Sequence, residues 1–218
     1  MIMLVNGATQ TVRRYAGHPH LGRLTQPESG NDLVAFGADD CDKGADNNCL
    51  QGFDLDRWMA MCEGLRAARR LRFVAAPDAV ELTPRGPRGS WEGTLWLFRR
   101  FAPWLRSRGL PVAIVSQDGA IVETVPWDAI DALFVGGSDA HKCGPEAAYL
   151  IAAAKRRGKW VHVGRVNSKK RIDSFRTLGW LDGFQPDSFD GGQFSMFPDT
   201  YNPQYLDFLG QRTFGDAT

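Results

Sequence analysis

The feature that most constrains the fold of this chain is a regular alternation between short apolar runs and longer amphipathic segments. The apolar runs are nearly continuous, as is typical of strands that are covered on both faces of a sheet. Five such runs stand out, at residues 71–76, 111–116, 132–135, 160–163 and 187–190. Because a strand, a helix and a second strand in succession form a right-handed crossover, the pattern predicts a parallel sheet in an α/β fold.

The amphipathic segments between these runs have the start and stop signals of helices. Helices are predicted over residues 54–65, 94–108, 145–157 and 169–178. The third has proline at its first position, Pro145, and glycine just past its end, Gly158. The fourth should stop at Gly179, and Pro103 should kink or split the second.

Three weaker strand candidates precede the strong ones, at residues 2–5, 21–25 and 33–36. Together they make eight, the number of strands that closes a (β/α)8 barrel of the TIM type. Such barrels run to about 250 residues. The 218 residues here therefore predict a trimmed single-domain barrel over residues 1–218, with residues 209–218 as a loose tail. An open doubly wound sheet is the alternative, although its Gly-x-Gly-x-x-Gly signature is missing after the first strand.

Charge and composition exclude several classes of protein. The chain has 26 Lys and Arg against 25 Asp and Glu, so a polyanion site would have to be a local patch. Its four cysteines have neither the density nor the spacing of a disulfide framework or a Cys-x-x-Cys zinc site. No basic leader precedes the first strand candidate, and no apolar run reaches the ~20 residues of a membrane span. We expect a cytoplasmic protein with no membrane partner.

Each strong strand candidate is followed at once by polar residues or glycines. These clusters contain Asp78, Gln117, Gly136 and Gly137, Arg165 and Asn167, and Asp190. The carboxyl ends of barrel strands converge on one face, where active sites are built. Asp78, Asp190 and a third carboxylate at Asp46 could there supply an acid, a base and a nucleophile. The alternative is structural, because Asp and Gly are also ordinary turn formers.

In their order, these motifs resemble those of the tRNA-guanine transglycosylases, and more closely those of the DpdA-type DNA guanine transglycosylases of phages and bacterial genomic islands. The likeness runs from about residue 46 to residue 194. It rests on five matches: Asp46-Asn-Asn-Cys-Leu-Gln51, Phe-Val-Ala-Ala-Pro-Asp78, Gln117-Asp-Gly119, Val135-Gly136-Gly137 and Asp187-Ser-Phe-Asp190. The queuosine enzymes of this family carry a Cys-x-Cys-x-x-Cys…His zinc site, in a C-terminal extension that helps to hold tRNA. This chain has no such motif, which favours DNA as its substrate.

The resemblance implies a role for each matched residue. Asp190 would be the nucleophile that holds the sugar at C1′, and Asp46 would be the general acid/base. Asp78 would accept hydrogen bonds from the guanine edge, while Gln117 and the amides of Gly136 and Gly137 would face its carbonyl side. The implied partners are guanine sites in DNA and a free 7-deazaguanine base such as preQ0. Neither a cofactor nor a metal is implied, and a homodimer is possible.

Two residues near the predicted nucleophile need separate interpretation. Asp187 competes with Asp190 for that role, but strand alternation places the two on opposite faces, so only one should point into the site. His162 lies inside a predicted strand and is interpreted as a packed core residue rather than a ligand. A metal site at His141 and Cys143 is the alternative to no metal at all.

Residues after the fourth strong strand are candidates for the nucleic-acid backbone. They follow a strand and open a helix, whose N-terminal amides favour phosphate. They are Arg165, Asn167, Lys169, Lys170 and Arg171. The sequence therefore predicts a DNA guanine transglycosylase, in the host cytoplasm if it is phage-encoded. A tRNA-guanine transglycosylase, a base-removing N-glycosidase and a non-catalytic nucleic-acid-binding barrel are the alternatives.

Overall fold

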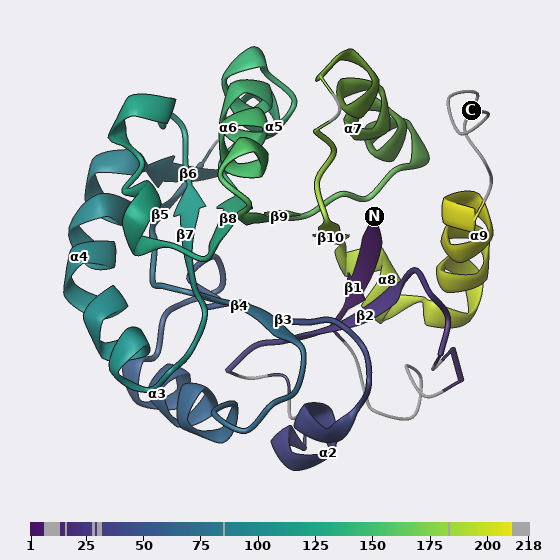
Figure 1. The fold of residues 1–218 in the computed structure, drawn as a ribbon, viewed down its shortest axis with the longest axis horizontal. Helices are drawn as coiled ribbons and strands as arrows, with labels where there is room; N and C mark the ends of the chain where they lie inside the picture. Colours follow the sequence, from purple (N-terminus) through teal and green to yellow (C-terminus); the bar gives the residue numbers. More distant parts are fainter. Residues whose placement is uncertain are drawn as a thin grey trace.

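The structure is a closed barrel of eight parallel strands surrounded by helices (Figure 1). It is a computed structural model that describes residues 1–6, 14–15, 17–27, 29, 32–84, 86–182 and 184–210. The barrel strands are β1 (Ile2–Val5), β2 (Leu21–Thr25), β3 (Lys43–Ala45), β4 (Leu71–Ala75), β7 (Val112–Ser116), β8 (Ala132–Val135), β9 (Trp160–Val163) and β10 (Ser188–Asp190). Sequential strands are neighbours, and β10 closes the barrel against β1. The predicted (β/α)8 barrel is confirmed.

Helices and short turns connect successive strands. They are α2 (Leu33–Ala38), α3 (Leu55–Gly64), α4 (Trp91–Ser107), η1 (Val122–Thr124), η2 (Trp127–Ala129), α5 (Asp139–Lys142), α6 (Pro145–Arg156), α7 (Lys169–Asp182), α8 (Gly192–Met196) and α9 (Pro198–Gly210). One predicted helix end was wrong, because α7 continues past Gly179. Pro103 does not split α4, which runs as one helix over Trp91–Ser107. Of the predicted tail, Leu209 and Gly210 end α9, and residues 211–218 lie outside the described residues.

The third strand of the barrel is not where the sequence pattern placed it. Residues 33–36 belong to helix α2, because the Asp32 side chain caps the amides of Val34 and Ala35. Val34 is 84% exposed while Phe36 is fully buried, which is the one-sided burial of a surface helix. The barrel strand is instead β3, whose sequence Lys-Gly-Ala has no apolar run.

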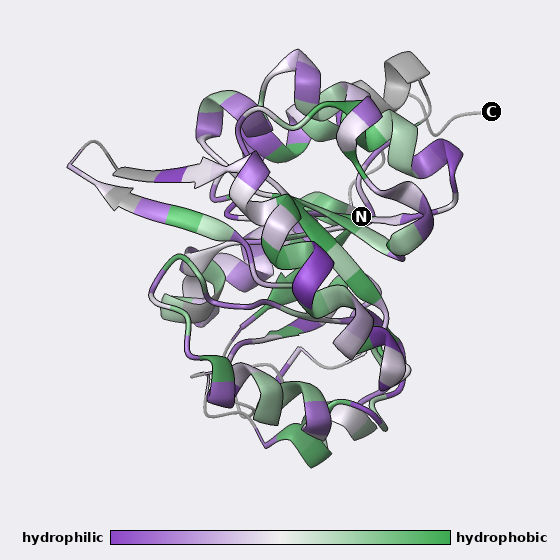
Figure 2. Cartoon of the chain, turned by 90° about the vertical axis from the view of Figure 1, so that its left-hand side faces the viewer, coloured by the Kyte–Doolittle hydropathy of each residue, from purple (hydrophilic) through white to green (hydrophobic). Residues whose placement is uncertain are grey.

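Steric demands inside the barrel explain why β3 lacks a strand signal. A Cβ atom on Gly44 would lie 2.3 Å from the ring of Phe73 on the neighbouring strand. Glycine at position 44 therefore makes room for Phe73, which fills the interior. The inward-facing apolar side chains form their own cluster, made of Leu4, Leu24, Phe73, Ala75, Ala113, Val115, Ala132 and Phe134. A larger apolar core lies between the barrel and the helices. The barrel strands are among the hydrophobic, green segments of Figure 2.

An antiparallel hairpin interrupts the barrel pattern between β4 and α4. Its strands are β5 (Ala79–Thr83) and β6 (Gly86–Ser90), and they form a sheet separate from the barrel. The hairpin projects away from the body of the molecule (Figure 2). Its base lies beside the barrel end, where Val80 and Gly89 line the cavity described below. No helix in the described residues is both long and apolar enough to cross a membrane.

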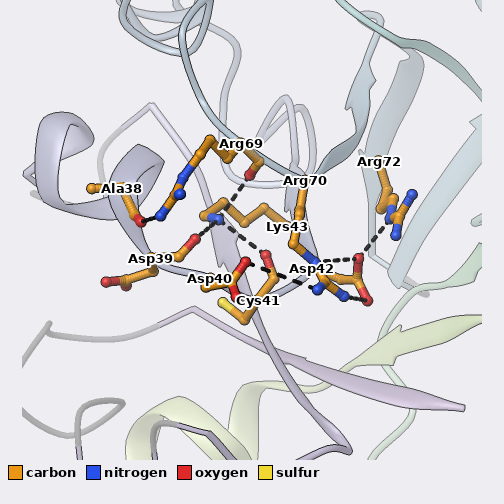
Figure 3. A network of polar contacts seen from close by, with 9 residues as sticks. All are labelled: Ala38, Asp39, Asp40, Cys41, Asp42, Lys43, Arg69, Arg70 and Arg72. Carbon is orange, nitrogen blue, oxygen red and sulfur yellow. Dashed lines mark hydrogen bonds and ion pairs between the residues drawn. The ribbon is translucent and has the colours of Figure 1, made fainter.

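A buried lysine holds together the amino-terminal end of the barrel (Figure 3). The Nζ atom of Lys43 donates to the carbonyl oxygens of Cys41 at 3.0 Å, Arg69 at 2.8 Å and Asp39. The side chain is fully buried, and desolvation lowers the pKa of Lys43. Three loop carbonyls thus depend on one ammonium group for their hydrogen bonds.

We expect Lys43→Met to lower the free energy of unfolding by about 2–4 kcal/mol, because it leaves these carbonyls buried without a donor. Lys159→Met is the matched control. Lys159 also lies at the start of a barrel strand, directly before β9. It is only half-buried, and it donates to one carbonyl, that of Ile130 at 2.7 Å. Urea denaturation of both variants tests the prediction, and equal losses would contradict it.

Candidate active site

A cavity of about 440 Å³ opens at the carboxyl ends of the barrel strands. Every barrel strand contributes to its wall, through the last residue of the strand or one that follows closely. These residues are Asn6, Gln26, Asp46, Asp78, Gln117, Gly136, Gly164 and Asp190. The prediction that the polar strand ends share one rim is confirmed.

Three carboxylates from three strands meet in this cavity. Asp46 follows β3, Asp78 follows β4, and Asp190 is the last residue of β10. They lie close enough for the charge of Asp190 to raise the pKa of Asp46 and for the charge of Asp46 to raise that of Asp78. Groups coupled in this way can divide acid and base roles between them.

Asp190 is held by two donors on one of its oxygens. Its Oδ1 accepts from His162 Nε2 at 3.2 Å and from the Arg165 amide at 2.9 Å. Arg165 has a φ of 59°, in the left-handed region that non-glycine residues seldom occupy. The backbone after β9 is thus in an unfavourable conformation at the position where its amide meets the carboxylate.

Asp187 lies on the opposite side of the strand, as predicted. Its carboxylate pairs with Lys155 Nζ at 2.6 Å and accepts from the Val161 amide at 2.8 Å. Lys155 belongs to the outer helix α6, so this ion pair ties α6 to the barrel and lies away from the cavity. Of the two aspartates, Asp190 is the one that lines the cavity.

Asp46 is oriented by a short chain of amides. Its Oδ2 accepts from Gln26 Nε2 at 3.0 Å, and its Oδ1 accepts from the Asn47 amide at 2.8 Å. The Asn6 side chain in turn donates to Gln26 at 2.6 Å, which fixes the orientation of that amide. Desolvation, helped by the charge of Asp190, raises the pKa of Asp46. Asp46 therefore keeps a proton to higher pH than an ordinary carboxyl group.

Asp78 is buried at the cavity wall, with 8% of its surface exposed. Its Oδ1 accepts from Asn47 Nδ2 at 2.9 Å, and its Oδ2 accepts from Gln117 Nε2. Desolvation, together with the charge of Asp46, raises the pKa of Asp78 to about 6. Since the Gln117 amide group is bonded to Asp78, Gln117 orients that carboxylate in addition to lining the cavity.

Of the two glycines after β8, Gly136 departs from its predicted role as an amide donor. The Gly136 amide donates to the Ser116 carbonyl at 3.0 Å, so it is already used in pairing with the neighbouring strand. A Cβ at position 136 would lie 2.7 Å from the Val115 side chain. Gly137 has a φ of 76°, which favours glycine. At Gly136 the structure thus shows close packing and an occupied amide, which corrects the prediction for that residue.

The predicted backbone-binding residues lie at different distances from the cavity. Arg165 and Asn167 line it, and the Arg165 guanidinium donates to the Gly137 carbonyl at 2.6 Å. Lys169 and Lys170 are exposed at the start of α7, where Lys169 lies over the rings of Tyr205 and Phe208. Arg171 is paired with Asp139 at 2.5 Å, so its charge is partly neutralised.

Sequence reasoning missed the site roles of four polar residues. Asn6 fixes the Gln26 amide. Gln26 and Asn47 orient Asp46 and Asp78, and His162 bonds Asp190. The strand-end rule would have found Gln26, because it directly follows β2, had the rule been applied to the weaker strands. Asn47 sits within the Asp46 motif. His162 is a packed core residue, as predicted, and its contact with Asp190 depends on register that the sequence does not specify.

Comparisons with known proteins identify the fold. No family model matches this chain, and no curated protein matches it either. Among solved structures, two mutants of the tryptophan synthase alpha-subunit from Pyrococcus furiosus match with TM-scores of 0.51 and 0.50 at 12% identity, covering 95% of this chain and 92% of each of those chains. An HpcH/HpaI aldolase from Desulfitobacterium hafniense DCB-2 gives a TM-score of 0.46 at 13% identity, with 98% and 93% coverage. For the two tryptophan synthase structures, the likeness at 12% identity extends to the fold alone.

Proposed function

We propose that this protein is a DNA guanine transglycosylase that replaces guanine in DNA with a free 7-deazaguanine base such as preQ0. One observation carries the proposal: Asp46, Asp78 and Asp190, from three separate strands, line a single cavity of about 440 Å³. Each position also matches an aspartate motif of the guanine transglycosylases in the expected order. Base exchange at C1′ needs a nucleophile, an acid/base group and a group that reads the base.

The exchange takes place in two displacements at C1′. In the first, an oxygen of Asp190 bonds to C1′ while the C1′–N9 bond breaks, and the departing guanine takes the electron pair. Asp46, whose raised pKa lets it hold a proton, protonates the departing base. In the second, the incoming base loses a proton to Asp46 and attacks C1′, which releases Asp190. Two inversions at C1′ give net retention, as in retaining glycosidases.

Asp78, with its carboxylate ionised, would recognise the base. Both of its oxygens can accept, and guanine offers a ring N–H and an exocyclic amine side by side. The Asn47 and Gln117 amides hold the carboxylate in place, and Phe134 and Val115 line the same cavity with apolar surface. A 7-deazaguanine keeps the same hydrogen-bonding edge, so one carboxylate can receive both the departing and the incoming base.

Features at the cavity mouth suit a nucleic acid better than a free nucleoside. Met196, which lines the cavity, is 66% exposed, and the next residue, Phe197, is 57% exposed. Apolar side chains of this kind are inserted between base steps by proteins that unstack a duplex. A target guanine has to leave the stack to reach Asp190, and Phe197 would fill the space that it leaves.

We expect Phe197→Ala to lower kcat/KM on duplex DNA by about 10-fold, since one base–aromatic stacking contact is worth about 1–3 kcal/mol. Exchange on a single-stranded oligonucleotide should fall less, because no stacked duplex has to be opened. The control is Trp96→Ala, at an aromatic side chain on helix α4 with a similar exposure of 60%. A comparable loss in both variants would contradict a role for Phe197 in opening the duplex.

Incubation of the purified protein with guanine-containing duplex DNA and preQ0, followed by nucleoside mass spectrometry, tests the proposed function. The expected result is a new deoxynucleoside carrying the 7-deazaguanine and an equal amount of released guanine. Incorporation into tRNA but not DNA would make the protein a tRNA-guanine transglycosylase. Release of guanine without incorporation would make it an N-glycosidase, and no reaction on either nucleic acid would overturn the proposal.

A further inference from the structure

A chain of hydrogen-bonded side chains with a fully buried centre runs through the barrel to the carboxylate of Asp190. It consists of Trp160 and His162 on β9 and Ser188 and Asp190 on β10. The parallel register of these strands places Ser188 directly beside His162. The side chains of His162 and Ser188 are fully buried, so they have no water to satisfy their hydrogen bonds.

Successive members of the chain are within hydrogen-bond distance. Trp160 Nε1 donates to Ser188 Oγ at 2.9 Å, and Ser188 Oγ lies 3.0 Å from His162 Nδ1. On the other side of the imidazole, Nε2 lies 3.2 Å from Asp190 Oδ1. The rings of Phe73 and Phe134 pack against the imidazole with centroids 4.9 and 4.5 Å away, which fixes its plane.

Donor chemistry determines where the proton of His162 lies. Indole Nε1 is only a donor, so Ser188 Oγ accepts from Trp160 and its own hydroxyl proton is free to point to His162 Nδ1. Nδ1 then accepts, and the neutral imidazole carries its proton on Nε2. That N–H points to Asp190 Oδ1, which as an ionised carboxylate can only accept.

We propose that His162 is a positioning residue for Asp190, held by Trp160 and Ser188 in the tautomer that donates from Nε2. This hydrogen bond and the one from the Arg165 amide both reach Oδ1. They leave Oδ2 as the oxygen that faces a reacting carbon. We call the hydrogen-bonded chain from Trp160 through Ser188 and His162 to Asp190 the relay. The relay is a property of the folded protein, whereas its effect on catalysis rests on the proposed function.

The relay transfers no proton during base exchange. When Oδ2 bonds to C1′, Oδ1 becomes the carbonyl oxygen of the glycosyl ester and keeps both of its donors. When the incoming base displaces the ester, negative charge returns to the carboxylate, and the same two donors stabilise it. A fixed donor of this kind orients the nucleophile in the first step and favours its departure in the second.

Nitrogen NMR of protein labelled with ¹⁵N-histidine tests the relay without reference to activity. The four histidines are assigned with a His162 variant, and the expected spectrum shows a neutral His162 ring with its proton on Nε2. In Ser188→Ala, Nδ1 loses its donor, so its ¹⁵N signal should shift, while Asp190 still favours the proton on Nε2. A wild-type ring protonated on Nδ1, or on both nitrogens, would overturn the proposal.

Kinetics of two variants tests the effect on the reaction. His162→Gln keeps an N–H donor, whereas His162→Leu has none. We expect the leucine variant to lower kcat about 10- to 100-fold with KM for the free base unchanged, and glutamine to restore most of the loss. Unchanged kcat in a folded leucine variant, or equal losses in both variants, would overturn a positioning role. If the wild type exchanges no base, the proposed function fails, and the NMR result still decides the relay.

Discussion

Asp190→Asn should reduce base exchange by about 10⁴-fold or more, because an amide cannot form the bond to C1′ on which both displacements depend. Asparagine has nearly the same size as aspartate, and its carbonyl oxygen can still accept from His162 and the Arg165 amide, so the fold should persist. The measurement is incorporation of labelled preQ0 into DNA by variant and wild type. The wild type, trapped with DNA before the second base is added, should also form a covalent complex that the variant lacks.

Asp187→Asn is the matched control for this experiment. It changes a carboxylate on the same strand segment, three residues earlier, but on the face that pairs with Lys155 and the Val161 amide. We expect some loss of thermal stability from the weakened tie between α6 and the barrel, and near-normal exchange per folded molecule. Loss of exchange in Asp187→Asn with activity retained in Asp190→Asn would transfer the nucleophile role to Asp187.

Most barrel strands were predictable because they pack on both faces. Strands such as 132–135 and 160–163 are covered by helices outside and side chains inside, so their sequences are continuous apolar runs with sharp ends. β3 escaped prediction for the opposite reason. Position 44 requires glycine because Phe73 from the next strand fills the interior. Lys43 can be buried because loop carbonyls accept its hydrogen bonds. Both facts depend on neighbours distant in sequence.

The rim of the candidate site followed from topology alone, whereas its internal hydrogen bonds did not. Once the strands were known to be parallel, Asp78 and Asp190 had to lie at the same end of the barrel. The partners of these carboxylates depend on register and side-chain rotamers. Thus Gln117 donates to Asp78, and the Gly136 amide donates to the Ser116 carbonyl. The sequence had predicted that both groups would contact the base.

Protonation of Asp78 as the pH falls through about 6 should stabilise the fold and, under the proposed function, inactivate the protein. Its pKa rises from 3.8 to about 6 on folding, so the native state binds the proton more tightly than the unfolded chain does. The stability contributed by protonated Asp78 is complete below about pH 4 and is lost as the pH rises through about 6. A rise of the pKa from 3.8 to about 6 corresponds to about 3 kcal/mol in the free energy of unfolding.

Under the proposed function the activity should change in the opposite direction, because only ionised Asp78 could accept from both donors of guanine. Below about pH 6, kcat/KM should fall by up to 10-fold per pH unit. Urea denaturation of wild type and Asp78→Asn between pH 4 and pH 8 isolates the stability effect, since the variant has no charge to lose. If the difference in the free energy of unfolding between wild type and Asp78→Asn does not vary with pH, Asp78 is not titrating in this range.

Asp118→Asn provides a control of opposite sign. Although burial alone would raise the pKa of Asp118, hydrogen bonds from the Ser138 amide and hydroxyl lower it. Its contribution to stability is therefore present above the pKa of the unfolded chain and lost as the pH falls through the lower native value. Asp78 and Asp118 lie near the same end of the barrel. If their contributions to the free energy of unfolding change with pH in opposite directions, the raised pKa of Asp78 comes from its burial against Asp46 and not from its position on the rim. Under the proposed function, reading a purine edge with a desolvated carboxylate at Asp78 would carry this cost in stability at neutral pH.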